Sequence, residues 1–573
     1  MTTYQCCCGL SAEEKYGGRD VGFSYPERKW PNRTIDEAPV LLSCDLRDGN
    51  QSLGSPMTFD QKMEMFLLLV ALGFKEIEVG FPCANTTEFD FVRYLVDTPG
   101  LIPDDVWIQV LSPCREDAIR TTIDSVRGAR QVLIFTYLPS SDLARQTVLG
   151  LTEAQWIDQA VRGARWIRSL TEDDVEGKSK SKTRWRFGFG FEDFASARAE
   201  AVIACADAIS AAWQPSREEW IYLGVASSVE VSQPNVFADQ VEHFSNSIAR
   251  RDCIRLAVHA HNDRGTAVAS AELACLAGAQ RVEGCLFGNG ERAGNLDLVT
   301  FALNLLARGI DPTLDLRRLD DVRGHCERLT GIPVHLRAPY AGDYSFRAFS
   351  GGHQDAISKG VHRRAAGASS VNGGSSPVWP QWRIPYLPID PAEVGRSIYS
   401  VMGITSQSGK AGVVMAVRTG LELDVPVELA RAFSRSVKQR SLDVAAELSV
   451  EETCAYFLST FRVREAVKLA AEQFNEHTDN ATTVAVTAAY DARTHGTFVS
   501  SHPVYNTSGV WTRWSNHLST STSKTAEPLV ASYIRLQVEL HLDVWGVGIG
   551  QDEEHARMCA AYSAVLARNG PLQ

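Results

Sequence analysis

The chain has 573 residues, a formal net charge of −12 and a pI near 5.6. This length predicts two or three domains, and a content of 44% hydrophobic and 22% charged residues is typical of a globular protein in water. The acidic balance argues against non-specific binding to nucleic acid, which requires a basic surface.

The cysteines and the start of the chain indicate a reducing compartment. The 13 cysteines are odd in number and scattered, which is not the pattern of a disulfide framework. The N-terminus carries Glu13 and Glu14 and no apolar core of a signal peptide. No run of 18 apolar residues occurs that would span a membrane. We therefore expect a cytoplasmic protein without a membrane partner.

Between residues 40 and 308, short apolar strands alternate with longer amphipathic helical patterns. The helix after the first strand begins with a capping box formed by Thr58 and Gln61. Eight β/α units of this length predict an α/β fold, a closed (β/α)8 TIM barrel, with an open doubly wound sheet as the alternative. The predicted strands are 40–44, 76–81, 107–111, 131–137, 185–191, 221–226, 254–259 and 282–287.

The barrel is expected to fill residues 35–312, after an N-terminal extension of residues 1–34. Residues 313–440 have a mixed pattern and are expected to form a linker subdomain. Residues 441–573 contain strand-like runs at 483–489 and 534–540 and a helical pattern at 553–568. This order predicts a small α+β domain at the C-terminus.

Polar clusters follow the first, seventh and eighth predicted strands. Residues 45–51 read Asp-Leu-Arg-Asp-Gly-Asn-Gln, residues 259–263 read His-Ala-His-Asn-Asp, and residues 288–295 read Gly-Asn-Gly-Glu-Arg-Ala-Gly-Asn. In a parallel barrel the carboxyl ends of the strands meet at one face, where functional side chains belong. We therefore expect the three clusters to converge at that face.

His259 and His261 are the most specific signal in these clusters. Residues two apart in a strand point to the same face, so both imidazoles can reach one ion. Asp48 and the amide oxygen of Asn295 would complete a mixed nitrogen and oxygen site for a divalent ion. Such a pair alone more often marks hydrogen-bonded surface histidines, but three clusters at three strand ends favour a metal site. The glycine-rich stretch lacks a nucleotide-binding spacing and is interpreted as a turn that presents Glu291 and Asn295.

These clusters resemble the signature blocks of 2-isopropylmalate synthases, which are metallolyase-like barrel enzymes. The similarity continues through residues 349–356 (Phe-Ser-Gly-Gly-His-Gln-Asp-Ala), 385–391 (Pro-Tyr-Leu-Pro-Ile-Asp-Pro) and 406–410 (Ser-Gln-Ser-Gly-Lys). It covers residues 25–440 strongly and the C-terminus weakly. So many ordered blocks are not a chance match.

The resemblance implies an acetyl-CoA-dependent acyltransferase. Such an enzyme joins the methyl carbon of acetyl-CoA to the ketone carbon of a 2-oxo acid and releases CoA. The resemblance implies a divalent metal (Mg, Mn or Zn) as cofactor, and Arg47 as a fixed positive charge beside the ketone oxygen. The implied metal ligands are Asp48, His259, His261 and Asn295.

Further residues match functional positions of the family. Glu192 matches a catalytic glutamate, and His353 and Tyr386 match a pair that residues 313–440 deliver over the barrel mouth. These three are expected to take part in removing the methyl proton, with the accepting group left open. Gln51 and Glu291 are expected to support the site. A homodimer is expected, with residues 441–573 as a regulatory-like and dimerising domain.

The chain departs from leucine-pathway members of the family after three strands. Their patterns His-x-Tyr-Asn, Ser-Pro-Glu and Asn-Leu-Pro-Ala-Thr are replaced by Phe-Thr-Tyr-Leu at 135–138, Gly-Phe-Glu at 190–192 and Gly-Val-Ala-Ser-Ser at 224–228. We predict a widened, more aromatic pocket for an arylpyruvate such as 4-hydroxyphenylpyruvate, a precursor for a lengthened aromatic amino acid in secondary metabolism. The expected pocket residues are Phe135, Tyr137, Gly190, Gly224, Ala226 and Ser228.

Other functions remain open from the sequence. The first alternative is a 2-isopropylmalate synthase of leucine biosynthesis that uses 2-oxoisovalerate. A carbon–carbon lyase on the same barrel is disfavoured by His353 and Tyr386, which argue for condensation. A non-catalytic regulatory homologue is disfavoured because the expected catalytic and metal-binding residues are all present.

Overall fold

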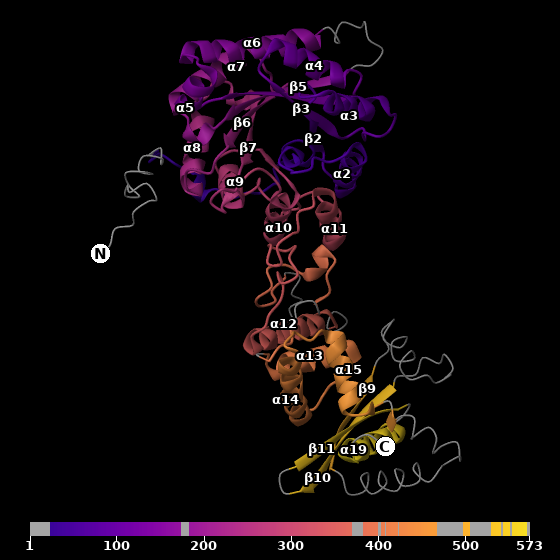
Figure 1. Cartoon of the computed structure of the whole chain (residues 1–573). Coiled ribbons are helices and arrows are strands. Elements are labelled where there is room, and N and C mark those ends of the chain that lie inside the picture. The colour runs from indigo at the N-terminus through magenta and orange to yellow at the C-terminus, as the bar shows by residue number, and fades with distance from the viewer. Residues whose placement is uncertain are drawn as a thin grey trace, which may run out of the picture. The chain divides into compact units, whose positions relative to one another are not determined.

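The computed structural model forms two compact units, Met1–Ser345 and Phe346–Gln573 (Figure 1). The first 22 residues and the predicted strand at 483–489 lie outside the described residues. The described residues are 23–172, 183–369, 382–398, 403–406, 408–421, 423–463, 465–466, 497–504, 529–539, 542–550 and 553–569.

Unit 1 contains a closed barrel of eight parallel strands in sequence order, which confirms the predicted fold. Strand β1 closes the barrel by pairing in parallel with β8 on one side and β2 on the other. The strands are β1 (Val40–Ser43), β2 (Glu76–Gly80), β3 (Trp107–Pro113), β4 (Gln131–Pro139), β5 (Arg184–Glu192), β6 (Ile221–Ser227), β7 (Ile254–Ala260) and β8 (Arg281–Gly284).

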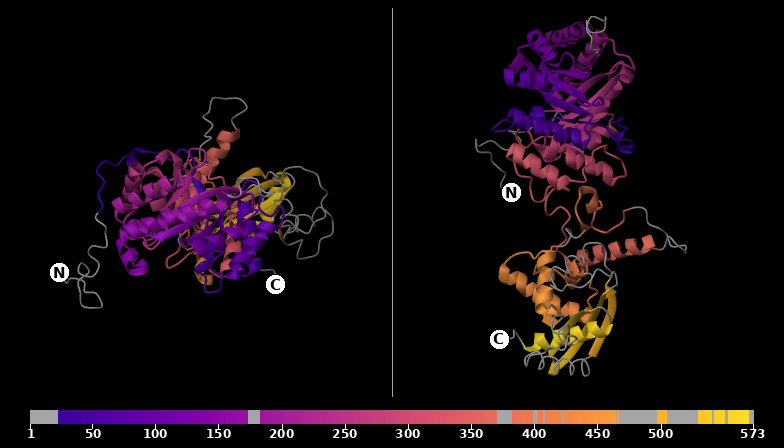
Figure 2. Two further views of the ribbon diagram at one scale, coloured as in Figure 1. Left: turned by 90° about the horizontal axis from the view of Figure 1, so that it is seen from above. Right: turned by 90° about the vertical axis from the view of Figure 1, so that its right-hand side faces the viewer.

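Helices surround the strands, and Figure 2 shows this unit from two further directions. The predicted capping box is confirmed, because the Thr58 side chain accepts from the Gln61 N–H at the start of α2. The long helices are α2 (Phe59–Leu72), α3 (Thr86–Asp97), α4 (Glu116–Val126), α6 (Glu153–Glu172), α7 (Ala199–Trp213), α8 (Pro234–Ser247), α9 (Ala267–Leu276), α10 (Leu298–Ala307) and α11 (Leu319–Thr330). The short ones are η1 (Trp30–Asn32), η2 (Asp45–Gly49), α5 (Asp142–Ala144), η3 (Arg145–Leu149), η4 (Phe194–Ser196), η5 (Arg251–Cys253) and η6 (Leu286–Gly288).

The eighth strand is shorter than predicted. It was expected at 282–287, but β8 ends at Gly284 and the chain turns into η6. The turn occurs because the Cys285 N–H donates to the Leu296 carbonyl, 3.1 Å away, instead of continuing the barrel ladder. Phe287 then takes a left-handed conformation with φ of 56°. This turn starts the loop that carries Glu291 and Asn295.

The segment before the barrel is anchored on α8. The indole nitrogen of Trp30 donates to Asp239 at 2.7 Å, and the Lys29 N–H donates to Glu242 at 2.7 Å. Arg33 lies 2.9 Å from the same Glu242 carboxylate. Both acidic side chains are buried, so the N-terminal segment supplies partners for two charges that would otherwise be costly inside the protein.

Unit 2 combines helices with a three-stranded antiparallel sheet in the order β11-β10-β9. One hydrophobic core joins α13, α14 and α15 to β10 and β11, so side chains on both sides of residue 440 share it. The predicted strand at 534–540 and helix at 553–568 are confirmed, whereas the predicted domain boundaries stay predictions. The elements are α12 (Gly351–Ser369), η8 (Pro391–Val394), α13 (Lys410–Leu421), α14 (Val427–Val444), α15 (Val450–Thr460), β9 (Thr497–Val504), β10 (Leu529–Glu539), β11 (Leu542–Gly550) and α19 (Glu553–Asn569). None of the described helices is long and apolar enough to cross a membrane.

Candidate active site

Asp48, His259 and His261 converge at the carboxyl end of the barrel. The two Nε2 atoms of the histidines are 3.3 Å apart, and Asp48 Oδ2 lies 3.6 Å from the first and 3.4 Å from the second. Ligands about 2.1 Å from one ion lie about 3.0–3.4 Å from each other in octahedral or tetrahedral sites. The three atoms are therefore spaced as ligands of one divalent ion would be.

Asn295 is the backbone partner of one of these ligands. Its backbone pairs with His261 in an antiparallel bridge, and its side chain is 1% exposed. The amide nitrogen donates to the Asn289 carbonyl at 3.1 Å, whereas the amide oxygen has no hydrogen-bond partner among the described residues. A buried acceptor without a donor is costly unless something outside the protein meets it. The set of two imidazoles, one carboxylate and one amide oxygen fits a divalent ion.

The glycines around Asn295 explain why the loop turns so sharply. Gly288 and Gly294 have φ angles of 74° and 99°, which side chains rarely adopt. A Cβ at Gly290 would lie 2.7 Å from the Asn295 N, so the loop folds directly against this residue. The prediction that the glycine-rich stretch turns the chain to present Glu291 and Asn295 agrees with this geometry.

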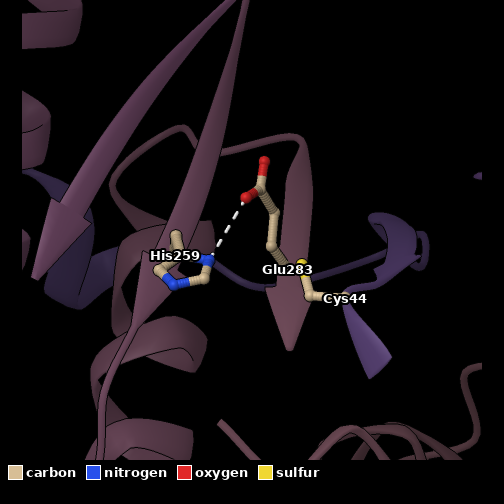
Figure 3. Close-up of side chains that lie close together, drawn as sticks. All are labelled: Cys44, His259 and Glu283. Atoms are coloured by element: carbon tan, nitrogen blue, oxygen red, sulfur yellow. Dashed lines mark ion pairs between the residues drawn. The ribbon is translucent and has the colours of Figure 1, made fainter. Parts of the chain in front are cut away.

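Glu283 holds the second nitrogen of His259. Its Oε2 lies 3.3 Å from Nδ1. Figure 3 marks this contact with a dashed line, and the other ring nitrogen, Nε2, faces Asp48. Burial lowers the pKa of His259, but the hydrogen bonds to Asp48 and Glu283 outweigh it and raise that pKa to about 9 in the metal-free protein. Cys44 lies beside this pair, but burial, Glu78 and Glu283 raise the pKa of its thiol well above the usual range. A protonated thiol is a poor ligand, so the Asp48 group is the better metal site.

Arg47 is fixed at the wall of the site by two carboxylates. Its Nη1 lies 2.6 Å from Asp48 Oδ1, and its Nε lies 2.6 Å from Glu78 Oε2. Gln109 donates to the other oxygen of Glu78 at 2.9 Å. Burial opposes ionisation of Asp48, but Arg47 and the two histidines hold its pKa well below the usual range. Asp48 is therefore an anion, and Arg47 cannot leave its place without breaking two ion pairs.

A cavity of about 490 Å³ opens above these groups. It brings together ten predicted residues that the sequence places on different strands and loops. Gln51 and Glu291 lie at its edge, where the Gln51 side chain donates to the Glu291 carboxylate at 3.5 Å. The predicted residues that line it, besides the two histidines and Asp48, are Arg47, Gln51, Phe135, Tyr137, Gly190, Glu192, Gly224, Ala226, Ser228 and Glu291.

The expectation that Gly190 and Gly224 leave empty volume in the wall is corrected by the structure. A Cβ at Gly190 would lie 2.9 Å from Phe135 Cε1, and one at Gly224 would lie 2.8 Å from Phe135 Cζ. The ring of Phe135, which is 6% exposed, therefore fills the space that these glycines free. Ser228 is also engaged, since its hydroxyl accepts from the Asp193 N–H at 2.9 Å. The pocket is aromatic, as predicted, but these glycines do not widen it.

Glu192 ends β5 at the cavity. Burial raises the pKa of its carboxyl, and the neighbouring charges of Asp193 and Glu291 raise it further. Burial and the charge of Glu192 in turn raise the pKa of Tyr137. A carboxyl with a raised pKa in a cavity is suited to exchanging a proton with a bound substrate.

His353 and Tyr386 lie together in unit 2. Their rings are stacked with centroids 4.0 Å apart and planes inclined by 23°, and Tyr386 is 62% exposed with a φ of 63°. The structure thus pairs the two residues as the resemblance implied. Their action at the barrel cavity stays a prediction.

Sequence reasoning missed three charged residues of the barrel interior, two of which, Glu78 and Glu283, line the cavity. Arg281 is fully buried, pairs with Glu283, and lies 3.0 Å from Glu76 Oε2. Glu78 and Glu283 contact the candidate ligands or Arg47 directly. The signal was present, because charged side chains in strands that are otherwise apolar must find partners inside the barrel.

Comparisons with known proteins agree with this site. Residues 38–325 match the HMGL-like family, and residues 343–417 match the post-catalytic domain of α-isopropylmalate synthases. The chain is 50% identical to isopropyl malate synthase AMT7 of Alternaria alternata, over 97% of this chain and 93% of that one. It is 46% identical to isopropyl malate synthase gloH of Glarea lozoyensis, over 96% and 92%. It is 40% identical to a 2-isopropylmalate synthase of Parafrankia sp., over 94% and 95%.

These matches span both units and include the segments that carry every candidate ligand. The chain has a possible site for a divalent metal, which members of the HMGL-like family use. The isopropylmalate synthase family uses acetyl-CoA and a 2-oxo acid as substrates. The chain therefore belongs to the isopropylmalate synthase family of acetyl-CoA-dependent condensing enzymes.

Proposed function

We propose that the chain condenses acetyl-CoA with an arylpyruvate, such as 4-hydroxyphenylpyruvate, to give an arylalkyl malate and CoA. The observation that carries this substrate is the aromatic wall of the cavity, where Phe135 and Tyr137 face a space bordered by the small residues Ala226 and Ser228. A substrate ring against this wall would gain about 0.5–1.5 kcal/mol beyond the burial of its surface.

The metal-binding role is assigned on the convergence of three donor atoms, from Asp48, His259 and His261, and on the buried amide oxygen of Asn295 that has no partner among the described residues. A bound ion would polarise the ketone of the oxo acid and stabilise the negative charge that develops on its oxygen. Arg47 adds a positive charge that is already oriented, because Asp48 and Glu78 hold its guanidinium at the cavity. The proposed ligands of this ion (Mg, Mn or Zn) are Asp48, His259, His261 and Asn295.

Two groups are proposed for removal of the methyl proton. One is Glu192, whose carboxyl lines the cavity. The other is the stacked pair of His353 and Tyr386. Once the proton has left, the methyl carbon bonds to the ketone carbon, and water then cleaves the thioester to release CoA. Exchange of the methyl hydrogens of acetyl-CoA with deuterium in D₂O, compared in Glu192→Gln and His353→Ala, separates the two, because loss of the base abolishes exchange.

A thiol-release assay across a panel of 2-oxo acids tests the substrate. We expect a higher kcat/KM for phenylpyruvate or 4-hydroxyphenylpyruvate than for 2-oxoisovalerate. If 2-oxoisovalerate is better by about tenfold or more, which corresponds to about 1.4 kcal/mol, the aromatic substrate is wrong.

The second candidate is condensation with 2-oxoisovalerate, as in leucine biosynthesis. It is favoured by the ring of Phe135, which occupies the space next to Gly190 and Gly224 and so reduces the room for a large side chain. The same panel of oxo acids decides between the two candidates.

We also propose that the protein acts as a homodimer. Light scattering should then give a mass twice that of the 62.9 kDa chain. A monomeric mass in the active preparation would exclude this proposal.

A further inference from the structure

Phe135 lies across three glycines on two neighbouring strands. Its partner across the β4–β5 pair is Gly188, and Gly190 pairs with Gly224 across the β5–β6 pair. All four residues face the barrel interior, because side chains alternate along each strand. The ring thus covers a slot whose base is made only of backbone.

Gly188 sets the tightest limit in this slot. A Cβ there would lie 2.6 Å from Phe135 Cε2 and closer still to Cδ2, which is inside the contact distance of two carbon atoms. Gly188 is buried and is not among the described residues that line the cavity, so it has no direct access to a substrate. Any side chain at this position would have to move the ring by about 1 Å to restore normal contacts.

The ring has one direction in which to move. Phe135 packs with Leu111, Leu133 and Tyr222 in a buried cluster, and the guanidinium carbon of Arg281 lies 5.3 Å from the ring centre. Tyr222 and Arg281 are fully buried, and both are tied to Glu76. Phe135 also lines the cavity, together with Leu111, so the cavity is the space beside the ring that these buried side chains do not fill. A side chain at position 188 would therefore push the Phe135 ring into the space where the oxo acid is proposed to bind.

We infer that Gly188 is a specificity-determining position, which acts through Phe135 by setting the depth of the 2-oxo acid pocket. This inference rests on the proposed function, because it requires that the oxo acid side chain lies on Phe135. Because residue 188 has no side chain, the Phe135 ring can lie directly against the β5 backbone. This position of the ring leaves more of the cavity free for a bulky side chain of the 2-oxo acid. Gly188 is a positioning residue, since it would touch no substrate itself.

The test is a double-variant cycle of Gly188→Ala and Phe135→Ala, read as kcat/KM for phenylpyruvate, 2-oxoisovalerate and 2-oxobutyrate. In the Gly188→Ala variant we expect the value for the bulkiest accepted substrate to fall by about tenfold or more, and that for 2-oxobutyrate to change by less than about threefold. In the Phe135→Ala background the same change at 188 should have little effect, because no ring is left to displace. Gly324→Ala on α11, where nothing lies within 4 Å of the new methyl group, is the matched control.

Each outcome decides the inference. An equal loss for all three oxo acids, or an undiminished loss in the Phe135→Ala background, would overturn it. If Gly188→Ala does not fold, as judged by its thermal unfolding, the same change is made in the Phe135→Ala background, where the inference requires folding to return because no ring is left to clash with the new methyl group. A wild-type preference for 2-oxoisovalerate would remove the proposed arylpyruvate but not the coupling, which is then read on 2-oxoisovalerate against 2-oxobutyrate.

Discussion

Replacing Glu283 by glutamine tests how the barrel interior holds the metal site. The carboxylate bridges two groups, since Oε2 lies 3.3 Å from His259 Nδ1 and Oε1 accepts from Arg281. Glutamine keeps the shape but loses the charge that fixes the Nδ1 proton, so the imidazole is held less firmly with Nε2 towards Asp48. Removing such a partner typically weakens metal binding about 10–100-fold, which is about 1.4–2.8 kcal/mol.

The assay is competition for Mn²⁺ between the metal-free protein and a chelator of known affinity. Glu76→Gln is the matched control, because Glu76 Oε2 lies 3.0 Å from the same Arg281 but has no contact with His259. Both variants should lower Tm, since each leaves the buried arginine with one carboxylate fewer. Only Glu283→Gln should lose metal affinity. Equal losses in the two variants would refute the reasoning and show that Glu283 matters only for stability.

Three further predictions follow from the same site. Removal of the metal with a chelator should abolish activity, and adding a divalent ion should restore it. The variant His259→Ala should stay folded but bind little metal. An unchanged metal content in that variant would contradict the ligand assignment. Arg47→Lys should lower kcat by about 10²–10³-fold, because lysine keeps the positive charge but cannot keep both contacts of the guanidinium. The loss of kcat should exceed any loss of stability seen as Tm, and near-normal turnover would leave Arg47 a purely structural role. Burial raises the pKa of Asp45 to about 7 from 3.8, against its hydrogen bonds from Ser43 and Leu286. Wild type should therefore lose free energy of unfolding as the pH rises from about 4 to about 7, because the buried carboxyl must ionise. Asp45→Asn has no such group, so its free energy of unfolding in urea should rise relative to wild type by up to about 4 kcal/mol over this range. A constant difference between the two proteins from about pH 4 to about 7 would contradict the prediction.

The strands were predictable because each is a local pattern. Strands buried on both faces read as short apolar runs, as around Ile134, Leu223 and Val258. Such runs predicted the ends of seven of the eight strands nearly correctly. The end of the eighth strand was not predictable. It depends on the hydrogen bond from Cys285 to Leu296, a contact that no local pattern records.

The candidate site likewise contains residues that the sequence predicts and residues whose role depends on the three-dimensional structure. Asp48, His259 and His261 were found because strand ends converge in a barrel, so sequence spacing alone indicates proximity. The meaning of Gly190 and Gly224 was missed, because it depends on which way the ring of Phe135 lies on a neighbouring strand. A small residue can mark either a hole or the seat of a larger neighbour, and only coordinates distinguish the two.

The attachment of the N-terminal segment to α8 has a consequence for biosynthesis. Trp30 donates a hydrogen bond to Asp239, which lies 209 positions later in the chain, and Val40 in β1 pairs with Arg281 in β8. At about 5–20 residues per second, the roughly 240 residues between β1 and β8 take about 10–50 s to be made. During that time the growing sheet has two open edges, which are prone to pairing with other chains. The barrel closes only after β8 has left the ribosome, so β1 remains without its second neighbour until the other seven strands have been made.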